Sequence, residues 1–99
     1  MDEDGFERDD EKRRRNVEKH GIDFEEAVEI FYGPYLTRRS DRKQEVRWLA
    51  VGESQGRIIA VAFTRRNGRI RIISARRARQ NETRTYRRET MGRSKKGQD

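Results

Sequence analysis

The spacing of apolar residues along the chain changes near Pro34 from a helical period to a strand period. From Phe24 to Phe31, apolar residues recur at i, i+3, i+4 and i+7, which places them in one stripe on a helix. This spacing predicts a helix over residues 23–32, with Asp23 as its N-cap and the Gly-Pro pair as its end.

A preceding helix is predicted over residues 11–19. Asp9 or Asp10 can cap its start, and Lys19 with His20 at its end suits the helix dipole. Gly21 is the expected terminator, because glycine adopts the left-handed conformation that commonly follows a helix.

Beyond Pro34 the pattern is typical of strands joined by tight turns. The predicted strands are a short edge strand at 6–8, a short candidate at 35–39, and 46–51, 57–64 and 69–75. Residues 40–44 form a charged turn, residues 53–56 a hairpin loop, and Asn67-Gly68 is the strongest hairpin signal.

Residues 57–64 are apolar on both faces, which predicts the central strand of a sheet. In the next strand Ile70 and Ile72 share one face, and Ile73 and Ala75 are expected to extend the second face inward. A last helix over 81–89 places Glu82 and Tyr86 one turn apart. The order β-α-α-β-β-β-α predicts an α+β fold: a small antiparallel β-meander with two N-terminal helices and one C-terminal helix.

The chain has 99 residues, which predicts one domain over 1–90 and a disordered basic tail over 91–99. Only 18 residues are Leu, Ile, Val or Phe, but 16 of them lie within 22–73, so a small core is expected there. No apolar run approaches the ~20 residues of a membrane span. The chain has no cysteine, which excludes disulfides and thiolate sites, and a cytoplasmic location is expected.

Charge is unevenly divided along the chain. Residues 1–31 carry 12 acidic and 6 basic side chains, a net of −6, whereas residues 32–99 carry 6 and 19, a net of +13. Arginine supplies 20 of the 25 cations, and its planar guanidinium suits forked contacts to phosphate. We therefore expect a polyanion such as nucleic acid to bind the larger segment.

Several other chemistries lack support in the sequence. The chain has no phosphate-binding glycine loop, no glycine-framed nucleophilic serine and a single histidine, so no metal and no cofactor are expected. RNA can be cleaved without a metal by attack of its own 2′-hydroxyl, given a base, an acid and cations for the phosphoryl charge. His20 is one candidate proton carrier, although a role in ending its helix is equally open.

Two separated motifs resemble the BrnT family of bacterial toxins. The first comprises residues 6–9, Lys12 and residues 16–27, which resemble F-E-W-D, a helical lysine and N-x-x-K-H-G-[VI]-x-F-E-E-A. The second half matches in the same order: Glu45-Val46-Arg47, Gly52, the strand 56–64, the segment 69–78 (R-I-R-[IV]-I-S-A-R-x-A), and Glu82 with Tyr86. Arg8 departs from the pattern, because the family usually has tryptophan there.

The resemblance implies a ribonuclease toxin of a type II toxin-antitoxin system, with a RelE-like fold. Such a toxin inhibits translation by cleaving RNA without a metal. It is neutralised by a BrnA-like ribbon-helix-helix antitoxin, through which the complex binds DNA. No membrane association is implied.

Carried over residue by residue, the resemblance suggests two groups of site residues. The catalytic candidates are Lys12, His20, Arg65 and Arg76. RNA-binding candidates are Arg47, Arg57, Arg71 and Tyr86, with Glu82 supporting Arg76; for Tyr86 a packing role is equally open, and Trp48 is expected in the core.

Two other functions would use the same composition. One is a non-catalytic nucleic-acid-binding regulatory module, which would bind RNA in a salt-dependent manner without cutting it. The other is a structural subunit that is inactive outside an obligate complex. In the toxin hypothesis, the antitoxin is expected to cover part of the basic surface with acidic residues.

Overall fold

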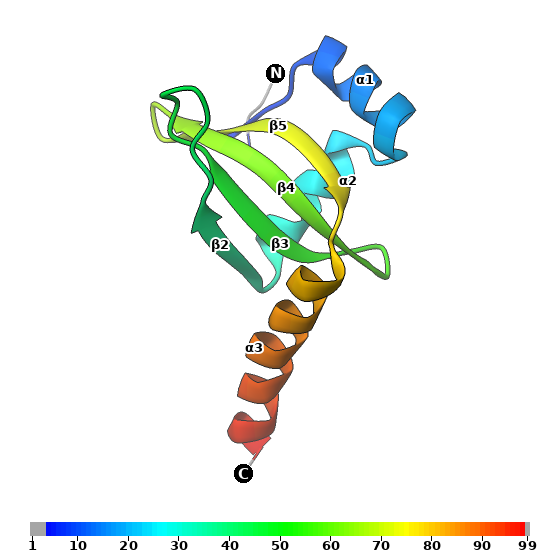
Figure 1. Cartoon of the computed structure of the whole chain (residues 1–99), viewed down its shortest axis with the longest axis vertical. Helices are drawn as coiled ribbons and strands as arrows, with labels where there is room; N and C mark the ends of the chain where they lie inside the picture. Colours follow the sequence, from blue (N-terminus) through cyan, green and yellow to red (C-terminus); the bar gives the residue numbers. More distant parts are fainter. Residues whose placement is uncertain (1–3, 99) are drawn as a thin grey trace.

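The structure, a computed structural model, describes the backbone of residues 4–98 and the side chains of residues 4–91. Its elements are β1 (Phe6–Glu7), α1 (Asp10–His20), α2 (Phe24–Glu29), the 3₁₀ turn η1 (Ile30–Tyr32), β2 (Tyr35–Arg39), β3 (Trp48–Ser54), β4 (Arg57–Arg66), β5 (Arg69–Arg77) and α3 (Gln80–Gln98). The predicted α+β class is confirmed (Figure 1).

The five strands form one sheet in the order β1-β5-β4-β3-β2. Strands β2 to β5 pair antiparallel with their sequence neighbours, and β4 is central as predicted. Strand β1 instead pairs in parallel with β5, Phe6 opposite Ile70. The sheet is therefore mixed, which corrects the expectation of a purely antiparallel one.

Two-residue turns close both inner hairpins. Asn67 and Gly68 have φ of 55° and 76°, and Gln55 and Gly56 have φ of 53° and 80°. Positive φ at both central positions is typical of the turns whose twist matches antiparallel strands. The turn at Asn67 is confirmed, whereas the loop predicted over 53–56 is shorter because β3 continues to Ser54.

A β-bulge changes the side-chain alternation in β5. Phe63 pairs with Ile72 while Ala62 pairs with Ser74, so Ile73 is an extra residue. An extra residue resets the two-residue period. Ala75 consequently packs in the same core cluster as Ile72, and the expectation that it lies with Ile73 on the opposite face is wrong.

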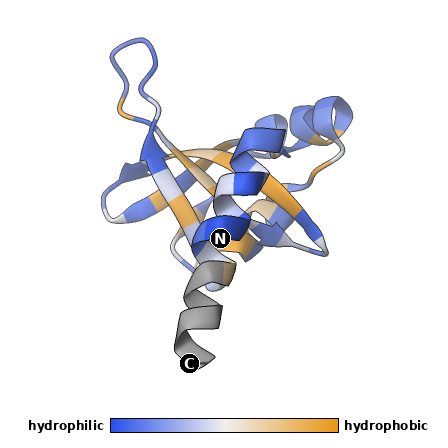
Figure 2. Ribbon diagram, turned by 60° about the horizontal axis from the view of Figure 1, so that its bottom comes forward, coloured by the Kyte–Doolittle hydropathy of each residue, from blue (hydrophilic) through white to orange (hydrophobic). Residues whose placement is uncertain are grey.

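Apolar residues pack on both faces of the sheet, and in Figure 2 the hydrophobic colouring follows the strands. One face is covered by α2 and η1, through a cluster of Phe6, Ile22, Phe24, Ala27, Val28, Ile30, Ala50, Ile59, Val61, Phe63, Ile72 and Ala75. We call this the helix-covered face. The other face carries Leu49, Val51 and Ala60 beneath Tyr86 of α3, and we call it the α3 face.

The predicted helix starts are confirmed by their caps. Asp9 accepts a hydrogen bond from the backbone N–H of Lys12 at 3.0 Å, and Asp23 accepts one from that of Glu25 at 3.4 Å. Gly21 ends α1 with φ of 69°. The second helix ends at Glu29, and the chain continues as the 3₁₀ turn η1 up to Tyr32, shortly before Pro34.

Gly52 lies where η1 approaches β3 most closely. A Cβ at this position would be 2.7 Å from the Cβ of Ile30 and 3.3 Å from that of Tyr35. Such contacts are too short for any side chain, so glycine allows the 3₁₀ turn to pack directly on the strand.

Asn16 fastens α1 to β5 from a position that is 6% exposed. Its amide nitrogen donates to the carbonyl oxygens of Ile22 at 2.8 Å and Ala75 at 2.9 Å. Its amide oxygen accepts from the backbone N–H of Ala75 at 3.0 Å. The two bonds to Ala75 join segments 59 residues apart in the sequence.

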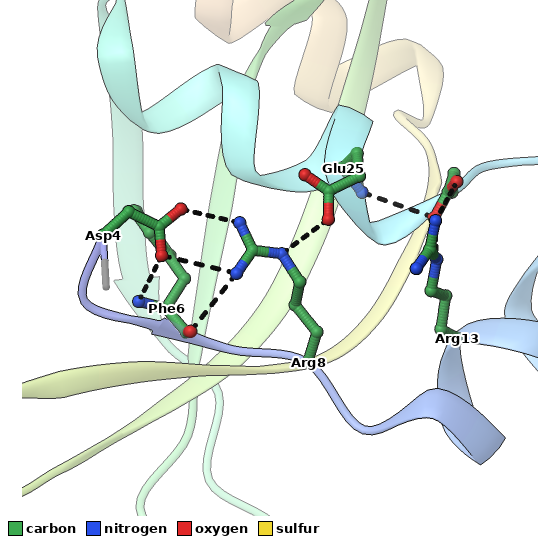
Figure 3. Close-up of polar contacts among 6 residues, drawn as sticks. Asp4, Phe6, Arg8, Arg13 and Glu25 are labelled. Atoms are coloured by element: carbon green, nitrogen blue, oxygen red, sulfur yellow. Dashed lines mark hydrogen bonds and ion pairs between the residues drawn. The ribbon is translucent and has the colours of Figure 1, made fainter. Parts of the chain in front are cut away.

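Arg8 bridges the N-terminal segment to α2 (Figure 3). Its guanidinium contacts the Asp4 carboxylate at 2.7 Å and, through Nε, the Glu25 carboxylate at 2.7 Å. It also donates to the carbonyl oxygen of Phe6 at 3.3 Å. Arg8, which stands where the family named above usually has tryptophan, thus takes part in an ion-pair network.

Helix α3 extends past residues 81–89, for which a helix was predicted, and projects away from the sheet (Figure 1). Among its described side chains, Glu82 and Tyr86 are buried. The helix covers much of the segment where a tail was expected, and the division at residue 90 stays a prediction. In the described part of the chain, no helix has the length and apolarity to cross a membrane.

We predict that Asn16→Ala lowers the free energy of unfolding by about 3 kcal/mol, because it leaves buried backbone groups of Ile22 and Ala75 without partners. Chemical denaturation followed by circular dichroism measures this change. The neighbouring Val17→Ala, at a position that is 44% exposed, is the control and should cost less than about 0.5 kcal/mol. Equal losses in both variants would contradict the proposed role of Asn16.

Candidate functional site

A basic hollow of about 220 Å³ opens on the α3 face of the sheet, and we call it the arginine groove. Small residues of the two central strands, Ala60, Ala62 and Ser74, lie at its base. The remaining lining residues are Arg38, Ser40, Arg42, Arg47, Trp48, Leu49, Arg76 and Arg79. Among the described residues, five arginines therefore surround one small hollow, and no carboxylate side chain lines it.

Strand register explains how these residues come together. Arg76 lies opposite Ala60, and Ala62 lies opposite both Ser74 and Leu49. Arg38 is in turn opposite Leu49 at the outer strand. Because side chains at paired positions share a face, small residues in the middle leave space that the long arginines border.

Glu82 holds Arg76 in place with two hydrogen bonds. The Arg76 Nη1 and Nη2 atoms donate to the two carboxylate oxygens at 2.9 Å each. The backbone N–H of Arg79 donates to the same carboxylate at 2.8 Å, and Arg38 approaches it to 3.6 Å. Glu82 is 8% exposed and the Arg76 side chain 25%, so this is a bidentate ion pair between a buried carboxylate and a partly exposed guanidinium.

The pKa of Glu82 is lowered to about 2, chiefly by the hydrogen bonds from Arg76 and next by the bond from the Arg79 backbone, although burial opposes the shift. The same pair raises the pKa of Arg76. Glu82 is therefore ionised at neutral pH, and it is too weak a base to accept a proton there.

Arg47 and Arg42 reach the groove from the loop between β2 and β3. Arg47 Nε lies 2.7 Å from the Glu45 carboxylate, and this contact is the main cause of the lowered pKa of Glu45. Arg42 and Glu45 exchange backbone hydrogen bonds across a turn in which Lys43 and Gln44 have φ of 49° and 66°. Non-glycine residues pay a conformational cost for this geometry.

Arg42 and Arg79 differ from the other arginines of the groove. Within the described part of the chain, neither has a carboxylate within 4.0 Å, whereas Arg38, Arg47 and Arg76 each contact one. The charges of Arg42 and Arg79 are thus available to an anionic ligand without breaking an internal ion pair.

The remaining predicted site residues lie outside the arginine groove. Lys12 is exposed on α1 and His20 ends that helix. Arg65 stacks on Trp48, which packs against the helix-covered core, with its guanidinium 5.5 Å from the ring centroid. Arg57 pairs with Glu26 on α2 at 2.9 Å, and Arg71 lies 4.0 Å from Glu7.

Of the two roles expected for Tyr86, RNA binding and packing, the structure favours packing. Its side chain lies in the apolar cluster of the α3 face, is 5% exposed, and donates its hydroxyl to the carbonyl oxygen of Pro34 at 3.1 Å. Burial is the main cause of its raised pKa. In this position the side chain exposes little surface on which a base could stack.

Arg38, Arg42 and Arg79 belong to the groove but were not among the predicted site residues. Arg38 reaches the groove because it lies opposite Leu49 on the neighbouring strand. Arg79 reaches it because it directly precedes α3. Pairing the predicted strand over 35–39 with β3 would have placed Arg38 on this face. No local signal identifies Arg42, because its position depends on the turn conformation.

Phosphodiester groups suit the arginine groove. Guanidinium groups offer forked donors that match phosphate oxygens, and a site enclosed by protein strengthens each contact relative to water. In the described residues, no three His, Cys, Asp or Glu side chains gather as a metal site would require.

The ion pair between Arg76 and Glu82 makes stability depend on pH. Because the folded-state pKa of Glu82 is about 2 and the usual value is 4.5, its contribution is complete above pH 4.5 and is lost as pH falls towards 2. We predict that wild-type protein loses about 3 kcal/mol more unfolding free energy than Glu82→Gln over this range, measured by urea denaturation. Glu89→Gln, which removes an exposed carboxylate from the same helix, is the control and should follow wild type. Parallel curves for wild type and Glu82→Gln would exclude the strong pair.

A comparison with protein families bears on the identity of the chain. A profile described as "Ribonuclease toxin, BrnT, of type II toxin-antitoxin system" matches residues 9–82. No match was found among curated proteins. The matched region runs from the N-cap of α1 to Glu82, and so includes strands β2 to β5 and every arginine of the groove. The chain therefore belongs to the BrnT family of ribonuclease toxins of type II toxin-antitoxin systems.

Proposed function

We propose that this toxin is a metal-independent endoribonuclease of the RelE-like type that binds RNA in the arginine groove and inhibits translation. The observation that carries the proposal is the convergence of Arg38, Arg42, Arg47, Arg76 and Arg79 over a base of small side chains. Because the side chains at the bottom of the groove are small, an RNA strand can approach the sheet closely, and the guanidinium groups can surround one phosphodiester.

In the proposed reaction, the 2′-hydroxyl oxygen attacks the adjacent phosphorus. A base takes the proton of the 2′-hydroxyl, and an acid gives a proton to the 5′-oxygen as the P–O5′ bond breaks. One product then carries a 2′,3′-cyclic phosphate and the other a 5′-hydroxyl. Negative charge accumulates on the non-bridging oxygens during the attack, and fixed cations lower the energy of that state. Arg76 is best suited to this role, because Glu82 holds its guanidinium in one orientation.

His20 is the sequence candidate for carrying a proton in this reaction. Lys12 and Arg65 are candidates for stabilising the phosphoryl charge. His20 and Lys12 both lie on α1, outside the arginine groove. Arg57 and Arg71, in ion pairs with Glu26 and Glu7, would contribute to RNA binding from the periphery.

A second candidate function is a non-catalytic RNA-binding module. The observation that favours it is the composition of the groove, which has no histidine and no lysine among the lining residues that the structure describes. Such a site can hold a phosphate, and the two functions differ in whether the strand is cut.

The partner of the proposed toxin is a BrnA-like ribbon-helix-helix antitoxin. A heteromeric complex would bind DNA through the antitoxin and leave the toxin inactive. The net charge of +13 over residues 32–99 supports an acidic partner surface.

We predict that purified protein cuts RNA in the presence of EDTA, that 2′-O-methyl RNA of the same sequence stays intact, and that the products carry 2′,3′-cyclic phosphate ends. Arg76→Lys keeps a positive charge beside Glu82 but loses the bidentate geometry. It should lower the cleavage rate by about 10²–10³-fold, as expected for one fixed donor. Arg84→Lys, at an exposed position of α3 outside the groove, is the matched control. Binding without cleavage of any substrate would support the RNA-binding module instead.

We predict that Arg42→Gln together with Arg79→Gln weakens binding to non-cleavable 2′-O-methyl RNA without lowering the thermal midpoint, because neither arginine contacts a carboxylate. If each contacts one phosphate, the slope of log K against log salt concentration should become shallower by about 1.4. Fluorescence anisotropy at four salt concentrations measures this slope. Arg84→Gln with Arg88→Gln removes the same charge from exposed positions of α3 and should change the slope less. An equal change in both double variants would mean that net charge, rather than the groove, governs binding.

A further inference from the structure

A second hollow, of about 450 Å³, adjoins the arginine groove on the α3 face, and we call it the apolar groove. It lies between α3 and the outer strands β2 and β3. The aliphatic side chains of Leu36, Leu49 and Val51 form its sheet side, and Thr37, Arg38, Asn81, Glu82, Thr85 and Glu89 complete the lining.

The two grooves are adjacent, because Arg38 and Leu49 line both of them. We call the pair of grooves the channel, which has one basic part and one aliphatic part. Helix α3 covers the rest of this face mainly through Tyr86, so the aliphatic part stays open along one flank of the helix.

The chemistry of the apolar groove suits a protein segment better than RNA. Its described lining includes the exposed carboxylate of Glu89, which repels phosphate, and no aromatic ring on which a base could stack. Aliphatic side chains, in contrast, gain from contact with Leu36, Leu49 and Val51.

The adjoining arginines define the charge of the occupant. Arg42 and Arg79 have no carboxylate within 4.0 Å in the described residues, so an acidic side chain placed in the arginine groove would complete ion pairs that the toxin leaves open. A single occupant with aliphatic side chains at one end and carboxylates at the other matches the whole channel.

We propose that one acidic, amphipathic segment of the antitoxin occupies both grooves, with its aliphatic side chains in the apolar groove and its carboxylates among the arginines. This inference rests on the proposed function, because it assumes that the arginine groove binds RNA. Neutralisation then follows from direct exclusion, since the antitoxin and the RNA use the same guanidinium groups.

Two threonines on opposite flanks of α3 allow a matched test. Thr85 is exposed and lines the apolar groove, whereas Thr83 lines the hollow on the other flank of the helix. Thr85→Trp fills the apolar groove, and Thr83→Trp adds the same side chain elsewhere. Each variant is prepared as the full chain, its thermal midpoint is measured, and its affinity for the purified antitoxin of the same system is determined by titration calorimetry.

We expect Thr85→Trp to weaken antitoxin binding by at least about tenfold, because a filled groove cannot accept the aliphatic side chains. Thr83→Trp should bind within about twofold of wild type, and both variants should cut RNA at the wild-type rate. Wild-type affinity for the antitoxin in Thr85→Trp would overturn the inference. Loss of RNA cleavage in Thr85→Trp with intact antitoxin binding would also overturn it, by assigning the groove to RNA.

A competition experiment tests the shared arginine groove. Labelled 2′-O-methyl RNA bound to the toxin should be released by stoichiometric antitoxin, and a ternary complex of RNA, toxin and antitoxin would contradict direct exclusion. The proposed function fails in a different way: wild-type toxin would then neither cut RNA nor bind 2′-O-methyl RNA, while the two threonine variants could still differ in antitoxin affinity.

Discussion

The arrangement of side chains on the α3 face depends on the hydrogen bonds that the buried carboxylate of Glu82 accepts. This carboxylate accepts two hydrogen bonds from Arg76 on β5 and one from the backbone of Arg79 at the start of α3. One side chain therefore sets the beginning of the helix, its position against the sheet and the orientation of an arginine in the groove. The structural ion pair and the proposed RNA-binding groove therefore share the side chain of Arg76.

Local sequence patterns predicted most of the secondary structure. Asp9, Gly21 and Asp23 marked helix ends, and the Asn67-Gly68 turn marked a hairpin, because each of these depends on the conformation of a few adjacent residues. The parallel pairing of β1 and the bulge at Ile73 were not predicted. Both arise from pairing between distant segments, for which a single strand's alternation contains no information.

The candidate site was predicted only in part for a related reason. The sequence indicated Arg76, Arg47 and Glu82, and the structure brings them to one face. It could not separate Arg57, which pairs with Glu26, from arginines without a partner, because an excess of positive charge does not show which cations are already compensated. The position of Arg42 depends on a turn in which Lys43 and Gln44 are left-handed. Lysine and glutamine are not typical of that conformation, so the sequence does not predict this turn.

The sheet also separates charge in space. The acidic residues Glu25, Glu26 and Glu29 belong to α2 on the helix-covered face, whereas the five arginines gather on the α3 face. Because Arg8 and Arg57 already pair with Glu25 and Glu26, the excess positive charge lies on the α3 face, and the molecule has an electric dipole across the sheet. A polyanion at a distance would exert a torque on this dipole and turn the α3 face towards itself before any contact forms. Orientation by the long-range field would then raise the fraction of encounters that are productive.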